Sequence, residues 1–225
     1  MTLAETFFNL EVLKHSMPLL LSGLWMTVQL AVTSILIGLP LGLAVCMTRL
    51  YAPKPFRLIA VAYIDVLRAL PILVVLIVIY YALPFVGVRL SSFVAATLGL
   101  SIALSAFSAE VLRSGISAVS RGQIEAATAL GLNFRAIMGF VVLPQAIRLV
   151  VPALTSNCIG LVKETSLASV VALSELLKQG NDAQALNANP TPLIAVAFIY
   201  LTFLWPLVRL VDRSDAKANR SRANA

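Results

Sequence analysis

Long apolar runs without any charge dominate the pattern along the chain. Four such runs lie between Lys14 and Arg49, Arg68 and Arg89, Arg89 and Glu110, and Asp182 and Arg209. Each is long enough for the roughly 20 residues with which a helix crosses a hydrocarbon core about 30 Å thick. The strict alternation of apolar and polar residues that is typical of outer-membrane strands is absent from the sequence. The pattern therefore predicts an all-α membrane protein.

Five spans follow from these runs and from the turn residues between them. The predicted spans cover residues 17–47, 58–83, 91–113, 149–168 and 192–211. The first is longer than a straight span needs, which predicts a tilt or an interfacial first turn, and Gly38-Leu39-Pro40 is expected to interrupt it. A basic turn with two prolines, residues 49–57, separates it from the second span, which Pro71 is expected to kink.

The remaining segments are too polar to span a bilayer. Residues 169–190 carry Lys178 with several Gln, Asn and Asp side chains, so we expect a short helix and a loop there. The polar tail, residues 212–225, is predicted to be disordered. The domain organisation is therefore one transmembrane domain, residues 1–211, followed by this tail.

The chain carries little charge, and the positions of its basic residues indicate an orientation. Only 12% of the 225 residues are charged, about half the share in soluble proteins, and the net charge is +7. If His15 lies outside, the inside segments hold Arg49, Lys54, Arg57, Arg113, Arg121, Arg135, Arg148, Arg209, Arg213, Lys217, Arg220 and Arg222, whereas the outside segments hold only Lys14, Arg89 and Lys178. An excess of Lys and Arg is typical of cytoplasmic segments. We predict an N-out, C-in topology, with anionic lipid rather than nucleic acid as partner of the basic tail.

Candidate chemistry within the chain itself is sparse. Cys46 and Cys158 both lie in apolar runs and indicate buried thiols rather than a disulfide. His15 is the only histidine, no His, Cys or Asp cluster has metal-ligand spacing, and no glycine-rich phosphate loop is present. No cleavable signal peptide is predicted, because the first residues lack a basic start. We expect no cofactor or metal on this chain and no catalytic residue.

The segment between the third and fourth spans, residues 120–139, has the features of two short surface helices; we name it the elbow. Ser120 and Gln123 have the spacing of a capping box at the start of the first helix. Gly131 suits the left-handed residue that ends it, and Asn133 can cap the second helix. Apolar residues recur there at helical spacing, which predicts that both helices lie at the membrane surface.

Several motifs in this order resemble a known family. They are Arg68-Ala69-Leu70-Pro71, Ala109-Glu110-Val111-Leu112-Arg113-Ser114-Gly115, Gly122-Gln123-Ile124-Glu125-Ala126-Ala127 with Gly131, Leu143-Pro144-Gln145-Ala146-Ile147-Arg148 and Lys163-Glu164-Thr165-Ser166-Leu167. The chain resembles the membrane subunits of binding-protein-dependent ABC importers, in the branch for polar amino acids, over residues 18–206. It departs from that branch at Ala69-Leu70 (commonly Gly-Thr), at Glu164 (commonly Asp) and at Phe107 (often Tyr).

The resemblance implies a type I ABC importer fold in the bacterial inner membrane and a permease role without catalysis. The elbow would couple the spans to a separate ATPase dimer, which binds ATP and Mg. The residues implied in coupling are Gln123, Glu125, Ala126, Ala127, Ala129 and Gly131. The other implied partners are an amino-acid substrate, a second permease (another copy or a sister chain) and an extracytoplasmic solute-binding protein that meets residues 85–90 and 169–190.

Polar and charged residues inside the predicted spans are candidates for the translocation path. Asn157 and Glu164 lie seven residues apart on one face of the fourth span, and the candidate path residues are Arg68, Asn157, Glu164, Thr165 and Ser166. The alternative is that such residues hold helices together. Asp65 with Arg68, and Glu110 with Arg113, have the spacing of neutralising helical pairs, and path lining is the alternative for Arg68.

Two other functions fit parts of the pattern. An ion-coupled secondary transporter would use Lys163 and Glu164 as its ion site, although such proteins usually show more spans or an internal repeat. An intramembrane enzyme would need an oriented pair such as serine and lysine, and no motif in the sequence orients one.

Overall fold

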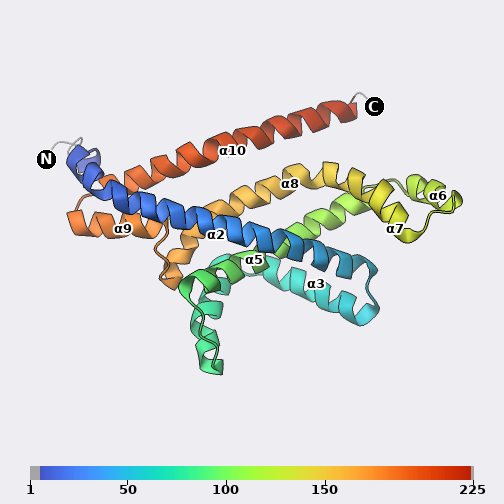
Figure 1. Ribbon diagram of the computed structural model, residues 1–225, viewed down its shortest axis with the longest axis horizontal. Helices are drawn as coiled ribbons and strands as arrows, with labels where there is room; N and C mark the ends of the chain where they lie inside the picture. Colours follow the sequence, from blue (N-terminus) through green and yellow to red (C-terminus); the bar gives the residue numbers. More distant parts are fainter. Residues whose placement is uncertain (1–5, 224–225) are drawn as a thin grey trace.

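The computed structural model describes the backbone of residues 6–223 and the side chains as far as Arg209, and every regular element in that part of the chain is helical (Figure 1). The elements are α2 (Leu10–Tyr51), α3 (Lys54–Ala69), α4 (Ile72–Ile77), the π-helix η1 (Val78–Ala82), the 3₁₀-helix η2 (Leu83–Val86), α5 (Ser92–Ser117), α6 (Arg121–Ala129), α7 (Phe134–Ala136), the π-helix η3 (Ile137–Val142), α8 (Leu143–Glu164), the 3₁₀-helix η4 (Thr165–Val171), α9 (Leu176–Asn187) and α10 (Thr191–Ala223). Within the described residues, four helical stretches can cross a membrane, or five if one bent pair counts as a span. The prediction of an all-α membrane protein with about five spans is confirmed.

Helix α2 is a single helix of 42 residues, longer at both ends than the predicted first span. It begins at Asn9, whose side chain accepts hydrogen bonds from two backbone N–H groups of the first turn. The expected interruption at residues 38–40 is wrong, since the helix continues through Pro40. Its glycines allow α2 to pack closely along α5: a Cβ added at Gly42 would lie 2.9 Å from the carbonyl oxygen of Ser105. Packing along α5 thus compensates for the hydrogen bond that Pro40 removes.

The second span is broken rather than kinked. Helix α3 ends at Ala69, and the stretch Ile72–Val86 leaves at 108° to it. Pro71 has no N–H to donate and disfavours helical backbone at the preceding residue, and Leu70 is extended with φ −88° and ψ 137°. The expectation of one kinked span over residues 58–83 is corrected accordingly.

Two of the three expected features of the elbow backbone are confirmed. Gly131 is left-handed with φ 76°, and the side chain of Asn133 accepts a hydrogen bond from the N–H of Ala136. The capping box is wrong, because Ser120 occupies the N-cap position without any side-chain capping bond. Nor is the second helix separate: Phe134–Val171 is one helical stretch that contains the π-helix η3. The fourth span therefore begins within the elbow.

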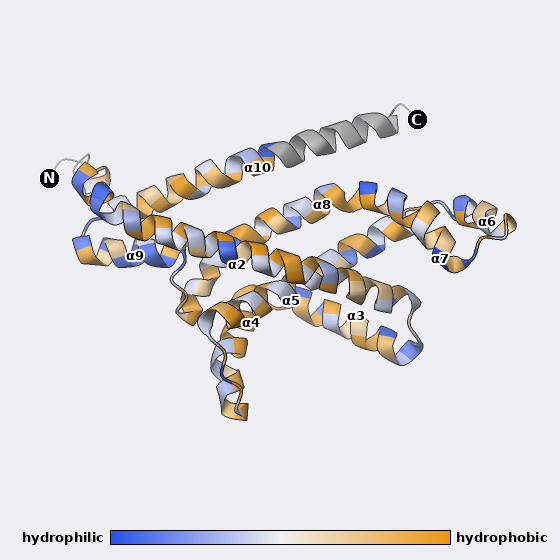
Figure 2. Cartoon of the chain, viewed as in Figure 1, coloured by the Kyte–Doolittle hydropathy of each residue, from blue (hydrophilic) through white to orange (hydrophobic). Residues whose placement is uncertain are grey.

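The polar segment before the last span contains α9, as expected of residues 169–190. Helix α10 then runs to Ala223, so the backbone of the tail, expected to be disordered from Asp212, is helical to that point. The basic side chains of the tail lie outside the part of the chain whose side chains the structure describes. Figure 2 shows hydrophobic residues (orange) recurring along α2, α4 and α8, whereas α9 carries more hydrophilic ones (blue).

Buried side chains form separate clusters along the length of the bundle. The largest includes Leu30, Leu76, Leu100, Leu161 and Leu173. The one nearest the elbow, named here the elbow-side cluster, consists of Cys46, Ile64, Ala109, Ile116, Val119, Ala127, Ile137, Met138, Val142 and Ala146. The elbow therefore shares one buried cluster with residues of α2, α3 and α5.

Candidate coupling and translocation site

The elbow lies at one end of the molecule, and α9 lies at the opposite end (Figure 1). Five of the six residues implied in coupling are exposed there: Gln123, Glu125, Ala126, Ala129 and Gly131. The sixth, Ala127, is buried in the elbow-side cluster. Helix α6 therefore presents one face outward and is held to the bundle by the other. Large apolar side chains also protrude here, since Leu130 of the elbow and Phe140, the residue directly after it, are more than 80% exposed.

Polar side chains tie the elbow to two neighbouring elements. The amide of Gln145, at the start of α8, donates to Gln123 Oε1 over 2.5 Å and to the carbonyl oxygen of Val141. On the other side, the Tyr51 hydroxyl donates to the sulfur of Met138 over 3.4 Å, and its ring meets that of Phe134 edge-on at 5.0 Å. Gln145 and Tyr51 were not candidates from the sequence, because their side-chain partners Gln123 and Met138 are 22 and 87 residues away.

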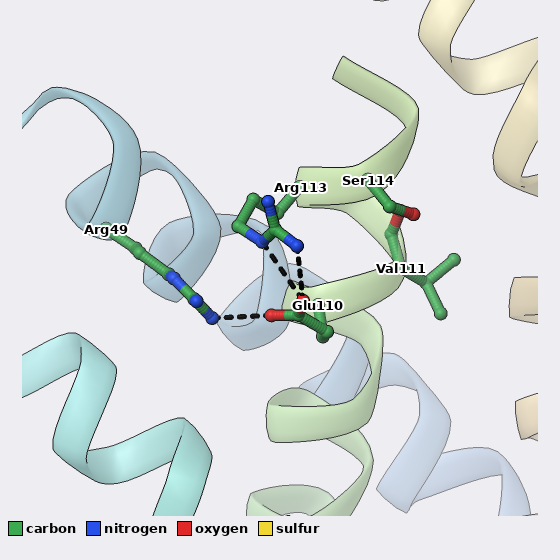
Figure 3. Close-up of polar contacts among 5 residues, drawn as sticks. All are labelled: Arg49, Glu110, Val111, Arg113 and Ser114. Carbon is green, nitrogen blue, oxygen red and sulfur yellow. Dashed lines mark hydrogen bonds and ion pairs between the residues drawn. The ribbon is translucent and has the colours of Figure 1, made fainter. Parts of the chain in front are cut away.

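A carboxylate with two guanidinium partners links the C-terminal parts of α2 and α5. Glu110 accepts hydrogen bonds from Arg113 on its own helix over 2.6 and 3.0 Å, and from Arg49 on α2 over 2.5 Å. Figure 3 shows the two guanidinium groups approaching this carboxylate from different sides. The predicted pairing of Glu110 with Arg113 is confirmed, and Arg49 is an addition that local spacing could not reveal.

The other predicted pair is wrong. Asp65 and Arg68 form no ion pair among the described side chains, and both are exposed. The guanidinium of Arg68 instead lies over the ring of Phe107, 5.9 Å from its centroid. Stacking of a cation on an aromatic face leaves the charged group free to bind a further partner.

A cavity of about 160 Å³ lies between α5 and α8, beside Phe107. It is lined by Leu104, Phe107, Ser156, Asn157, Gly160 and Glu164. The side-chain nitrogen of Asn157 is buried and lacks a hydrogen-bond partner among the described residues, so a polar ligand would satisfy it.

Two of the candidate path residues are engaged with their own helix. The Thr165 hydroxyl is fully buried and donates to the carbonyl oxygen of Val162, while the Ser166 hydroxyl donates to that of Lys163. Neither residue lines the cavity. Of the five candidates, Asn157 and Glu164 line the same cavity. Arg68 stacks on the ring of Phe107, which also lines that cavity.

Helix α9, at the end opposite the elbow, is fixed by a buried carboxylate. Glu175 accepts from the N–H groups of Leu177 and Lys178 over 2.9 and 2.7 Å and from the Tyr200 hydroxyl over 3.3 Å. Burial raises the pKa of Glu175 above its ordinary range, against the opposite effect of these donors. The next residue, Leu176, donates its N–H to the Thr27 hydroxyl over 3.1 Å. In the described part of the chain, no three His, Cys, Asp or Glu side chains gather as a metal site would require.

Comparison with known proteins agrees with this arrangement. The family described as "binding-protein-dependent transport system inner membrane component" matches residues 34–220. A probable glutamine ABC transporter permease of Bacillus subtilis is 35% identical over 95% of this chain and 99% of its own length, and an arginine transport permease of the same species is 35% identical over 88% and 94%. A chain of a solved amino acid ABC transporter with histidines superimposes with a TM-score of 0.87 at 34% identity, over 96% of this chain and all of that one. The chain therefore belongs to the family of inner membrane components of binding-protein-dependent transport systems.

Proposed function

We propose that this permease imports a polar amino acid or a close derivative, driven by ATP hydrolysis in a separate subunit. The observation that carries the proposal is a polar cavity between α5 and α8 together with a surface elbow packed on the same helices. Two relatives reported above are named for glutamine and arginine, which supports an amino acid as substrate.

The cavity has the polar groups that an amino acid needs. An α-amino acid carries a carboxylate and an ammonium. The Arg68 guanidinium beside Phe107 and the side-chain N–H of Asn157 can donate to the carboxylate, and Glu164 on α8 can accept from the ammonium. At about 160 Å³ the cavity is smaller than the roughly 300–1,000 Å³ of ordinary ligand pockets. This supports a path shared with a second permease, either another copy or a sister chain.

The elbow is the proposed contact for an ABC ATPase dimer, which would hold ATP and Mg. Its exposed small residues, Ala126 and Ala129, let a partner approach the helix closely, and Glu125 forms no ion pair within the described residues and can take a basic partner. The elbow would then lie in the cytoplasm and α9 outside, where a solute-binding protein delivers its substrate. This corresponds to the N-out, C-in orientation in the bacterial inner membrane that the basic residues predict.

Uptake into proteoliposomes, with the ATPase and the solute-binding protein present, tests the coupling role. Glu125→Lys reverses the acidic charge of α6, and Gly131→Pro removes the residue with φ 76°, which proline cannot adopt. Both variants should insert normally yet hydrolyse ATP without uptake. Full transport by both, or uptake by the wild type that follows an ion gradient without ATP, would refute the proposal.

The path is tested by Glu164→Gln, which keeps the shape of the side chain and removes its charge. We expect an altered preference among acidic, neutral and basic amino acids, with normal assembly of the complex. Ser166→Ala is the matched control, because that hydroxyl bonds its own helix and does not line the cavity. Loss of the complex in Glu164→Gln would indicate that the carboxyl holds helices together instead.

A further inference from the structure

We infer that Arg49 is a positioning residue for transport, and that its ion pair with Glu110 passes movements of the elbow to α5 and so to the cavity. The inference rests on the proposed function, since it requires that a motor acts on the elbow. It adds a specific route from the elbow to the residues beside the cavity.

The first step of the route joins the elbow to the last turn of α2. Tyr51 is the final residue of α2, and it contacts Phe134 with its ring and Met138 with its hydroxyl. Phe134 begins the helical stretch that leads to η3, and Met138 lies within η3. A displacement of the elbow therefore moves the end of α2 with it.

The second step joins that turn of α2 to α5. Arg49 lies two residues before Tyr51, and its guanidinium donates to Glu110 over 2.5 Å. Both side chains are about one-fifth exposed. A charged hydrogen bond that is partly removed from water is stronger than a surface ion pair and requires a defined direction and length.

The third step runs along α5. Phe107 lies one helical turn before Glu110, so the two side chains lie on the same face. Phe107 lines the cavity and carries the Arg68 guanidinium on its ring. A shift or rotation of α5 at Glu110 therefore moves a wall of the cavity and the cation beside it.

The apolar contacts of the elbow-side cluster cannot replace this link. Ala127 and Met138 do pack in the same cluster as Ala109 and Ile116 of α5. Hydrophobic contact is non-directional, however, so such surfaces can slide without pulling one another. Among the described side chains, Arg49–Glu110 is the one ion pair that joins α2 to α5.

The two guanidinium partners of Glu110 supply a matched pair of variants. Arg49→Gln removes the bond between helices, whereas Arg113→Gln removes only the bond within α5. In proteoliposomes with ATPase and solute-binding protein, the readout is solute imported per ATP hydrolysed. We expect Arg49→Gln to keep ATP hydrolysis but lower this ratio by about tenfold, as for the loss of one charged hydrogen bond. Arg113→Gln should stay within about twofold of the wild type.

A second variant covers the case in which Arg49→Gln does not assemble. Arg49→Gln combined with Glu110→Gln replaces the carboxylate that has lost one of its two guanidinium partners with a neutral amide, and it should assemble with the same low ratio. A wild-type ratio in Arg49→Gln or in the double variant, or an equal loss in Arg113→Gln, would overturn the inference. If the wild type itself shows no ATP-driven uptake, the proposed function fails instead, so the two failures are distinguishable.

Discussion

The close contact between α2 and α5 predicts that replacing a glycine by alanine destabilises the protein at Gly42, within that contact, but not at Gly139, outside it. In Gly42→Ala, the new methyl would lie 2.9 Å from the carbonyl oxygen of Ser105 and 3.0 Å from the Cβ of Ser108, both below the 3.4 Å at which ordinary contacts begin. The oxygen is a backbone atom and the Cβ is fixed to the backbone, so the helices must separate. Such overpacking costs about 1–3 kcal/mol.

The control is Gly139→Ala, where a new methyl meets no atom of the described residues within 4 Å. Both variants exchange a helical glycine for alanine and gain up to about 1 kcal/mol of helix propensity. The difference between them therefore isolates the contact and should equal the overpacking cost, about 1–3 kcal/mol. The measurement is the free energy of unfolding in mixed micelles as a denaturing detergent is titrated.

Equal stability of the two variants would refute this reasoning, because it would mean that α2 and α5 are not held at glycine distance. A loss of stability in Gly139→Ala as large as that in Gly42→Ala would refute it as well. Either result would also weaken the explanation given above for the continuity of α2 through Pro40.

Three further outcomes can be measured by the same unfolding titration. Asn133→Ala removes a helix cap and should destabilise the protein by about 1 kcal/mol, whereas Ser120→Ala should have little effect because that hydroxyl makes no capping bond. Thr27→Val leaves the buried N–H of Leu176 without an acceptor and should cost about 1–3 kcal/mol. Burial raises the pKa of Glu175 above 4.5 in the folded state, so the folded protein binds this proton more tightly than the unfolded chain. Stability should therefore decrease as the pH rises from 4.5 through the raised pKa, and Glu175→Gln should remove that dependence.

The sequence predicted those features that depend on neighbouring residues. Charge-free runs identified the spans, and backbone requirements identified Gly131 and Asn133, because each of these signals lies within one turn of the chain. The pairing of Glu110 with Arg113 was equally accessible, since the two residues share a helix face three positions apart.

The features that the sequence did not predict depend on distant partners. Arg49 bonds Glu110, which lies 61 residues away in the sequence. Arg68 stacks on the Phe107 ring and does not pair with Asp65, which is only three residues away in the sequence. Likewise, a proline alone does not reveal whether a span is kinked or turned through 108°. Tertiary packing decides such choices, and local spacing carries no information about it.

The break before Pro71 has a consequence for solvation. At 16 residues α3 measures about 24 Å, less than a hydrocarbon core of about 30 Å. The carbonyl groups of its final turn thus end at a depth where lipid offers no donors, and proline supplies none. Exposed peptide groups persist at such depth only beside protein or water. Because Ala69 and Leu70 are exposed on this chain, either water or a second protein surface must cover the end of α3 within the membrane.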